Sequence, residues 1–91
     1  MKKPTRLSDF KRVYITPYIS KAIVFYREVR KLTQEQLAEA SGLSLSAIKR
    51  LEAGRKRGGW ATSLEDVCMG LKIKLTELIA TADRLAVEAA A

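Results

Sequence analysis

Residues 33–54, TQEQLAEASGLSLSAIKRLEAG, carry two helix-start signals, and one glycine, Gly42, lies between them. Thr33 and Gln36 match the T-x-x-Q capping box, which predicts a helix that begins after Thr33. Gly42 can adopt the positive φ that ends a helix at little conformational cost. Ser44 is then the N-cap of a second helix, which we expect to end at Gly54. The stretch therefore predicts two short helices joined by a tight turn.

Five residues of this stretch stand at intervals that suit two helices crossing at a steep angle. Gly42 supplies the turn, and Ala38 allows a close approach, because a larger side chain there would push the following helix away. Leu37, Ile48 and Leu51 would lie on the inner faces and hold the crossing angle. This spacing is typical of a DNA-binding helix-turn-helix. The alternative is an ordinary helical hairpin with a solvated outer face, which leaves the basic composition unexplained.

The outer face of the second helix carries polar and basic side chains. An α-helix fits the major groove of B-DNA, where such side chains would point at base edges. Arg50 can form a bidentate pair with guanine, Lys49 can make a single contact to guanine or phosphate, and Leu45 can meet a thymine methyl. The predicted base-reading residues are Leu45, Ser46, Lys49 and Arg50.

Charge is unevenly distributed along the 91 residues, whose formal net charge is +7. Residues 1–31 carry nine basic and two acidic side chains, a net of +7. Residues 32–57 carry five and three, a net of +2, and residues 58–91 carry three and five, a net of −2. A basic front half and a slightly acidic back half favour a polyanion partner that meets one face.

Several classes of protein fit the composition poorly. The chain has no His and a single cysteine, Cys68, so it lacks the commonest general base and cannot form an intrachain disulfide. It has no metal-ligand cluster and no phosphate-binding glycine loop, so we expect no enzyme, cofactor, metal or small-molecule substrate. No apolar run approaches the roughly 18 residues of a membrane span, and we expect a cytoplasmic protein without membrane contact.

The rest of the chain predicts three further helices and an all-α fold. A helix begins near Thr16 and Pro17, another at Thr62 with Glu65 closing a capping box, and a fifth near Leu75. Short connections between five short helices indicate one compact domain. We expect a partly flexible N-terminal extension at residues 1–15, the helical domain at residues 16–80, and a C-terminal helix extension or tail at residues 81–91.

The segment LTQEQLAEASGLSLSAIKRLEAGRK resembles the Cro/CI-type helix-turn-helix family, also called XRE or lambda-repressor-like. The resemblance runs from about Ile19 to Ile79. It implies a compact five-helix lambda-repressor-like bundle, with the helix-turn-helix at its second and third helices. It also implies a sequence-specific regulator of transcription, which we expect to be a repressor that binds double-stranded DNA at a palindromic operator as a homodimer. Lys72 and Lys74 depart from the family, which often has Gly and a Ser cap at these positions.

The resemblance also assigns roles to individual residues. Gln34 matches the family's phosphate-contacting Gln at the start of the second helix, where free N–H groups favour an anion. Arg27 and Glu52 match an ion pair that bridges the first and third helices. Three basic residues of the loop after Gly54 are expected to meet phosphate. The predicted phosphate-contacting residues are Thr33, Gln34, Ser44, Arg55, Lys56 and Arg57.

Apolar residues beyond the needs of the core suggest a partner surface. A long stripe in the last predicted helix supplies the dimer candidates Leu75, Leu78, Ala82 and Leu85. The first predicted helix also has apolar residues that its core face does not need, namely Val24, Phe25 and Val29. These residues leave an alternative function open. In that alternative the chain is an antitoxin or anti-activator, which acts mainly through a protein partner while keeping the DNA-binding fold.

Overall fold

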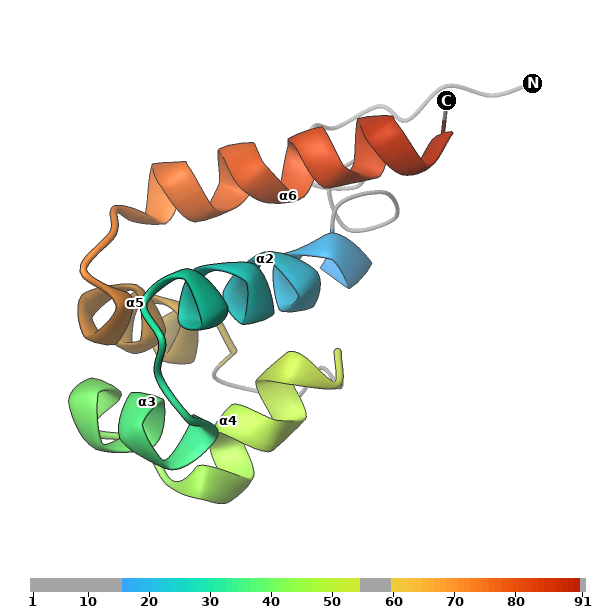
Figure 1. The fold of residues 1–91 in the computed structure, drawn as a ribbon. Helices are drawn as coiled ribbons and strands as arrows, with labels where there is room; N and C mark the ends of the chain where they lie inside the picture. Colours follow the sequence, from blue (N-terminus) through green and yellow to red (C-terminus); the bar gives the residue numbers. More distant parts are fainter. Residues whose placement is uncertain (1–15, 55–59, 91) are drawn as a thin grey trace.

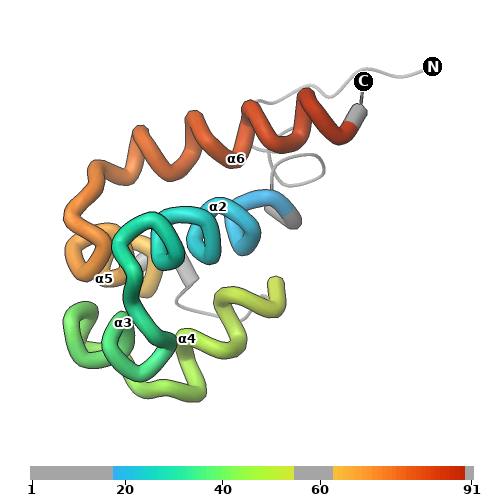
Figure 2. The backbone as a smooth tube through the Cα atoms, in the orientation of Figure 1, coloured from blue at the N-terminus to red at the C-terminus, as the bar shows by residue number. Residues whose placement is uncertain are grey.

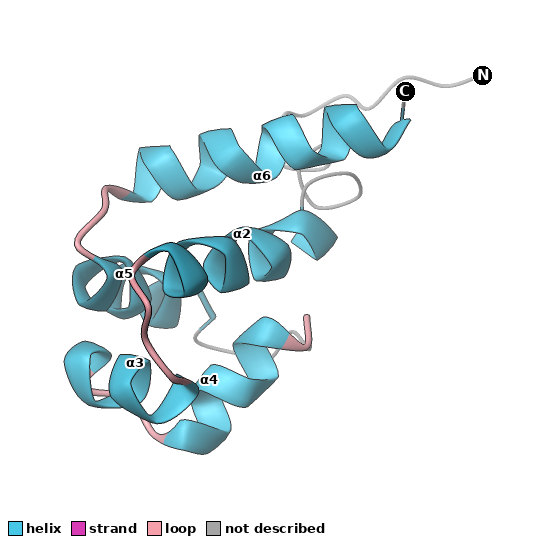
Figure 3. Cartoon of the chain, in the orientation of Figure 1, coloured by secondary structure: helices cyan, strands magenta, loops and turns pink. Residues whose placement is uncertain are grey.

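A computed structural model describes residues 16–54 and 60–90 of the chain. This part contains five α-helices and no strand, which confirms the predicted all-α class (Figures 1 and 3). The helices are α2 (Thr16–Val29), α3 (Gln34–Ser41), α4 (Leu45–Glu52), α5 (Trp60–Leu71) and α6 (Leu75–Ala90). The N-terminal extension, which was expected to be partly flexible, and the basic loop residues 55–57, which were expected to contact phosphate, lie outside the described residues.

The helices form two groups that share one core. Helices α2 and α6 run side by side in opposite directions, and α3 packs against both α4 and α5 (Figures 1 and 2). Tyr26 of α2 and Thr81 of α6 share a hydrogen bond of 2.7 Å between their side-chain oxygens. Thr81 is buried, so this bond satisfies a polar group that would otherwise lie unpaired between the two helices.

The core is apolar and takes residues from every described helix. Among its fully buried members are Ile23, Leu37 and Ile48, from α2, α3 and α4 respectively. Truncating a fully buried aliphatic side chain of this kind to alanine typically costs about 2–5 kcal/mol. The complete cluster is Ile19, Ala22, Ile23, Leu37, Ala38, Ile48, Leu51, Leu64, Val67, Cys68, Leu71, Leu78 and Ala82.

Three helices end with the same hydrogen-bond pattern, the Schellman motif. After α3, the N–H of Gly42 donates to the Glu39 carbonyl and the N–H of Leu43 donates to the Ala38 carbonyl. The same pair of bonds follows α2 and α5, where the left-handed residue is a lysine instead of glycine. Lys31 and Lys72 both have a φ of 59°. Lys72 therefore adopts the left-handed backbone conformation that glycine adopts more easily.

Three predicted helix boundaries need correction. Helix α5 begins at Trp60, two residues before the predicted start at Thr62, so Thr62 is a helical residue and cannot act as the N-cap. Helix α4 ends at Glu52, with Ala53 as its C-cap, and Gly54 follows with a φ of 79°. Helix α2 begins at Thr16 itself, whereas an N-cap at Thr16 would place the first helical residue at Pro17.

Helix α6 is continuous from Leu75 to Ala90 and contributes both to the core and to the surface. Leu78 and Ala82 have no exposed surface, so in this fold neither is available to a second copy of the chain. Leu85 is half-buried against the core, whereas Leu75 is 38% exposed. Of the four predicted dimer residues, only Leu75 and Leu85 therefore retain exposed surface. No helix of residues 16–54 and 60–90 has the length and apolar character needed to cross a membrane.

Candidate nucleic-acid interface

Helix α4 is strongly two-sided. Its N-cap Ser44 accepts a hydrogen bond from the Ala47 N–H at 3.1 Å, which fixes where the helix begins. Ile48 and Leu51 are 0% and 2% exposed and anchor one face in the core. The opposite face carries the predicted base-reading residues. Ser46, Lys49 and Arg50 are exposed, and Leu45 is half-buried.

The turn before α4 has the conformation that the sequence predicted. Gly42 has a φ of 69°, in the left-handed region that disfavours residues with a side chain. A Cβ atom at Gly42 would meet nothing within 4 Å, so backbone conformation rather than space demands the glycine. Ala38 is 6% exposed and lies in the core, as expected for a small residue between two crossing helices.

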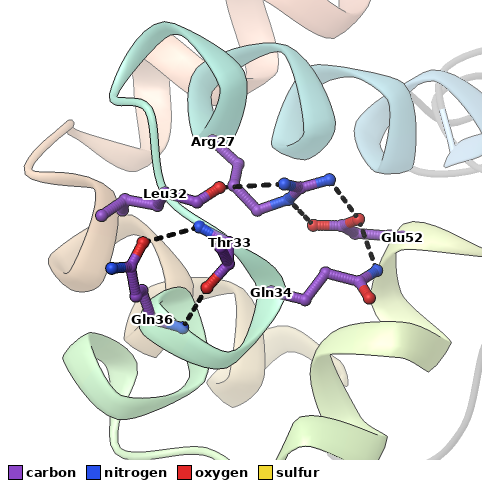
Figure 4. A network of polar contacts seen from close by, with 6 residues as sticks. All are labelled: Arg27, Leu32, Thr33, Gln34, Gln36 and Glu52. Atoms are coloured by element: carbon purple, nitrogen blue, oxygen red, sulfur yellow. Dashed lines mark hydrogen bonds and ion pairs between the residues drawn. The ribbon is translucent and has the colours of Figure 1, made fainter.

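Helix α3 begins with a complete capping box (Figure 4). The Thr33 hydroxyl accepts from the Gln36 N–H at 3.0 Å, and the Thr33 N–H donates to the Gln36 side-chain oxygen at 2.8 Å. The first-turn N–H groups of Gln34 and Glu35 have no acceptor within the helix. Thr33 is exposed and Gln34 is half-buried at this helix terminus, which favours an anion.

The predicted ion pair between Arg27 and Glu52 is present. Arg27 Nε lies 2.6 Å from Glu52 Oε2, and Arg27 Nη2 donates to Oε1 at 3.2 Å, so the contact is bidentate. Arg27 Nη1 also donates to the Leu32 carbonyl at 2.9 Å. The Arg27 and Glu52 side chains are 17% and 7% exposed. The pair therefore ties α2 to the end of α4 in a largely desolvated place.

The structure adds one member to this network that the sequence reading did not foresee. Gln34 Nε2 donates to Glu52 Oε1 at 2.9 Å, so the start of α3 joins the same carboxylate (Figure 4). The two residues are 18 positions apart, and no local spacing rule links a helix start to the end of the next helix. Only the crossing angle of α3 and α4 brings them together.

Two basic side chains at the site, Lys49 and Arg50, are exposed to solvent. Within the described ranges, neither Lys49 nor Arg50 forms an ion pair. The exposed hydroxyl of Ser44 lies at the start of the same helix. The site thus combines a basic outer face on α4 with the positive end of α3. The remaining phosphate candidates, Arg55, Lys56 and Arg57, lie in the part of the chain that the structure does not describe.

Comparison with known proteins supports the assignment of α3 and α4 as a helix-turn-helix. A helix-turn-helix family model, HTH_3, matches residues 25–57, which include α3, α4 and the turn between them. Among solved structures, the clp gene regulator ClgR from C. glutamicum matches with a TM-score of 0.69 and 27% sequence identity. This match covers 78% of the present chain and 91% of the ClgR chain. No curated protein sequence matches the chain.

The matched residues coincide with the geometry described above. They contain the Gly42 turn, the buried anchors of α4, and both partners of the Arg27–Glu52 pair. Over residues 25–57 the chain is therefore similar to the helix-turn-helix of the XRE, or Cro/CI-type, DNA-binding transcription regulators.

Proposed function

We propose that this protein is a sequence-specific regulator of transcription that inserts α4 into the major groove of double-stranded DNA. One observation carries the proposal. Ile48 and Leu51 fix α4 in the core, so its outer face presents Ser46, Lys49 and Arg50 to solvent. A helix held rigidly along one face, with hydrogen-bonding side chains along the other, suits the readout of base edges.

Phosphate contacts would supply affinity and orientation. The starts of α3 and α4 carry Thr33 and Ser44, and the N-terminus of a helix favours a negative charge. Basic side chains release counterions when they neutralise phosphates, so binding should weaken steeply as salt rises. On this view α3 sets the position of the protein on the duplex, and α4 selects the sequence.

We further propose a homodimer on a palindromic operator. A single recognition helix reads only a few base pairs, whereas two related by a twofold axis read half-sites about 34 Å apart. Helix α6 supplies the candidate surface. Leu75 and Val87 are 38% and 63% exposed, and a shallow hollow on this helix is lined by Leu75, Thr76, Ile79, Ala80 and Asp83.

Repression is the simplest consequence of such binding. Among the described helices, α4 is the proposed DNA-reading helix and α6 the candidate dimer helix. A dimer seated on an operator that overlaps a promoter blocks polymerase by occupancy and requires no activating surface. We therefore infer a repressor, with its own upstream region as the first operator to test.

The DNA proposal is tested by titrating the wild-type protein against two duplexes over a salt series. One duplex spans the region upstream of the protein's own gene, and the other has the same length and composition in random order. We expect tighter binding to the upstream duplex, and a logarithm of affinity that falls linearly with the logarithm of salt. Equal affinity for both duplexes at every salt concentration would contradict sequence-specific binding to that region.

The dimer proposal is tested by Val87→Lys, with Met69→Lys as the matched control. Val87 is 63% exposed on α6 and Met69 is 76% exposed on α5, so both changes place a charge at an exposed apolar position. Sedimentation should show Val87→Lys shifted toward monomer and Met69→Lys unchanged. A dimer that survives Val87→Lys at all concentrations would remove the end of α6 from the interface.

A protein partner is the second candidate function, and exposed residues of α2 favour it. Phe25 and Val29 are 42% and 55% exposed and stand one helical turn apart. In that case the chain is an antitoxin or anti-activator that buries this face of α2 in another protein. Co-expression with neighbouring gene products, followed by purification of wild type and Phe25→Ser, separates the two. A complex lost in the variant would favour this function.

A further inference from the structure

Three donor groups from two helices converge on the carboxylate of Glu52 at the end of α4. Oε2 accepts from Arg27 Nε at 2.6 Å, while Oε1 accepts from Arg27 Nη2 at 3.2 Å and from Gln34 Nε2 at 2.9 Å. Glu52 is 7% exposed, so these bonds form in a place where water competes little. One side chain thereby joins α2, α3 and α4 (Figure 4).

The orientation of the Gln34 amide follows from this contact. An ionised carboxylate can only accept hydrogen bonds, so the NH₂ group of Gln34, and not its carbonyl, must face Glu52. The NH₂ group has two N–H donors, and the bond to Oε1 uses one of them. The second N–H belongs to the same planar group and is held in a fixed direction by the first.

The surroundings of Gln34 point to an anion as the acceptor for that second donor. Gln34 is the first residue of α3, where backbone N–H groups lack acceptors within the helix. In the capping box, the side-chain oxygens of Thr33 and Gln36 accept hydrogen bonds from backbone N–H groups, and among the described residues no hydrogen bond fixes the direction of their own donors. The second N–H of the Gln34 amide is thus a side-chain donor at this terminus whose direction is fixed before a phosphate arrives.

We propose that Glu52 is a positioning residue for DNA binding: its carboxylate holds the Gln34 amide so that the second N–H is presented to a backbone phosphate. The inference rests on the proposed function. Fixing the amide in the free protein lowers the ordering cost of the contact on binding. It also couples the phosphate grip at α3 to α4, because Glu52 is the last residue of the recognition helix.

The Arg27 contacts make the role separable from folding. Arg27 is held by both Glu52 oxygens and by the Leu32 carbonyl, so removing the Gln34 amide leaves the ion pair in place. Gln34→Ala should therefore fold like wild type. Glu52→Asp keeps a negative charge opposite Arg27 but draws the carboxylate back by one methylene from both Arg27 and Gln34, so thermal unfolding is measured beside affinity. Glu52→Asp is preferred to Glu52→Gln, because the latter removes the charge that pairs with Arg27.

The test is a double-mutant cycle in Gln34→Ala and Glu52→Asp, read in DNA affinity and in thermal unfolding. We expect Gln34→Ala to weaken binding about tenfold, the value of one hydrogen bond to a charged group. The salt dependence should stay unchanged, because a neutral amide releases no counterion. Glu52→Asp should weaken binding in the wild-type background and have no further effect once Gln34 is alanine. Glu39→Asp, at an exposed position of α3, is the control.

Each outcome of the test contradicts a different part of the proposal. Affinity losses that simply multiply in the double variant would overturn the positioning role, since Glu52 would then act through the fold alone. Unchanged affinity in Gln34→Ala would overturn the phosphate contact. A wild-type protein that binds no duplex in the same titrations would contradict the proposed function itself, and the role of Glu52 with it. Binding by wild type without coupling contradicts only the role of Glu52.

Discussion

Gly70 of α5 and Ser41 at the end of α3 lie so close that no side chain fits between them. A Cβ atom at Gly70 would stand 2.3 Å from Ser41 Oγ, 3.0 Å from the Ser41 nitrogen and 3.2 Å from the Ala40 carbonyl carbon. Two of these three atoms belong to the backbone and cannot rotate away. The glycine thus allows α5 to support the first helix of the helix-turn-helix at close range.

Gly70→Ala should therefore destabilise the fold by about 1–3 kcal/mol, as overpacking of a filled core does. Alanine is the better helix former, so propensity alone predicts the opposite sign. Thermal or denaturant unfolding measures the difference. Ser41→Ala is the matched control. It removes an oxygen that has no hydrogen-bond partner among the described residues, and should cost little. A Gly70→Ala variant that unfolds at a higher temperature than wild type would contradict the packing argument.

Lys72→Gly should stabilise the protein by about 1 kcal/mol, because Lys72 has a φ of 59° in a conformation that glycine adopts freely. Lys49→Gly is the control. The same substitution inside α4 should cost about 1 kcal/mol through lost helix propensity. Denaturant midpoints of the two variants should move in opposite directions from wild type. A loss of stability in both variants would contradict this prediction. It would show that the Lys72 side chain stabilises the fold by more than its left-handed backbone conformation destabilises it.

The buried thiol of Cys68 should make the fold sensitive to alkaline pH. Burial raises the pKa of Cys68 from 9.0 to about 11, and the charge of Glu77 adds to the effect. The unfolded chain then loses the thiol proton at a lower pH than the folded chain. Stability is therefore fully present below pH 9.0 and declines as pH rises toward about 11. Unfolding of wild type and Cys68→Ala across this range should show the steeper decline in wild type. Parallel curves would contradict it.

The sequence predicts what local rules control. The capping box at Thr33, the cap at Ser44 and the left-handed turn at Gly42 each depend on residues within a few positions of one another. The same holds for the buried positions of α3 and α4, because helical periodicity places them on one face. A capping signal can also mislead, because Thr62 and Glu65 match a capping box and yet α5 begins two residues earlier, at Trp60.

Relationships across the bundle could not be predicted in this way. The bond from Gln34 to Glu52 and the contact of Gly70 with Ser41 join residues that only the tertiary packing brings together. Periodicity correctly grouped Leu78 and Ala82 as one apolar stripe, but it could not tell a core face from an interface. Helix α2 covers that face, so both residues are buried within the chain itself.

Arg50 offers the sharpest measurement, because it is exposed on α4 and has no role in the core. The affinities of wild type and Arg50→Ala for the upstream and random duplexes should be compared at one salt concentration. If α4 reads bases, the substitution removes most of the preference for the upstream duplex, a loss of about 1–3 kcal/mol, and changes random binding much less. Equal losses on both duplexes, or none on either, would contradict the claim that α4 reads sequence.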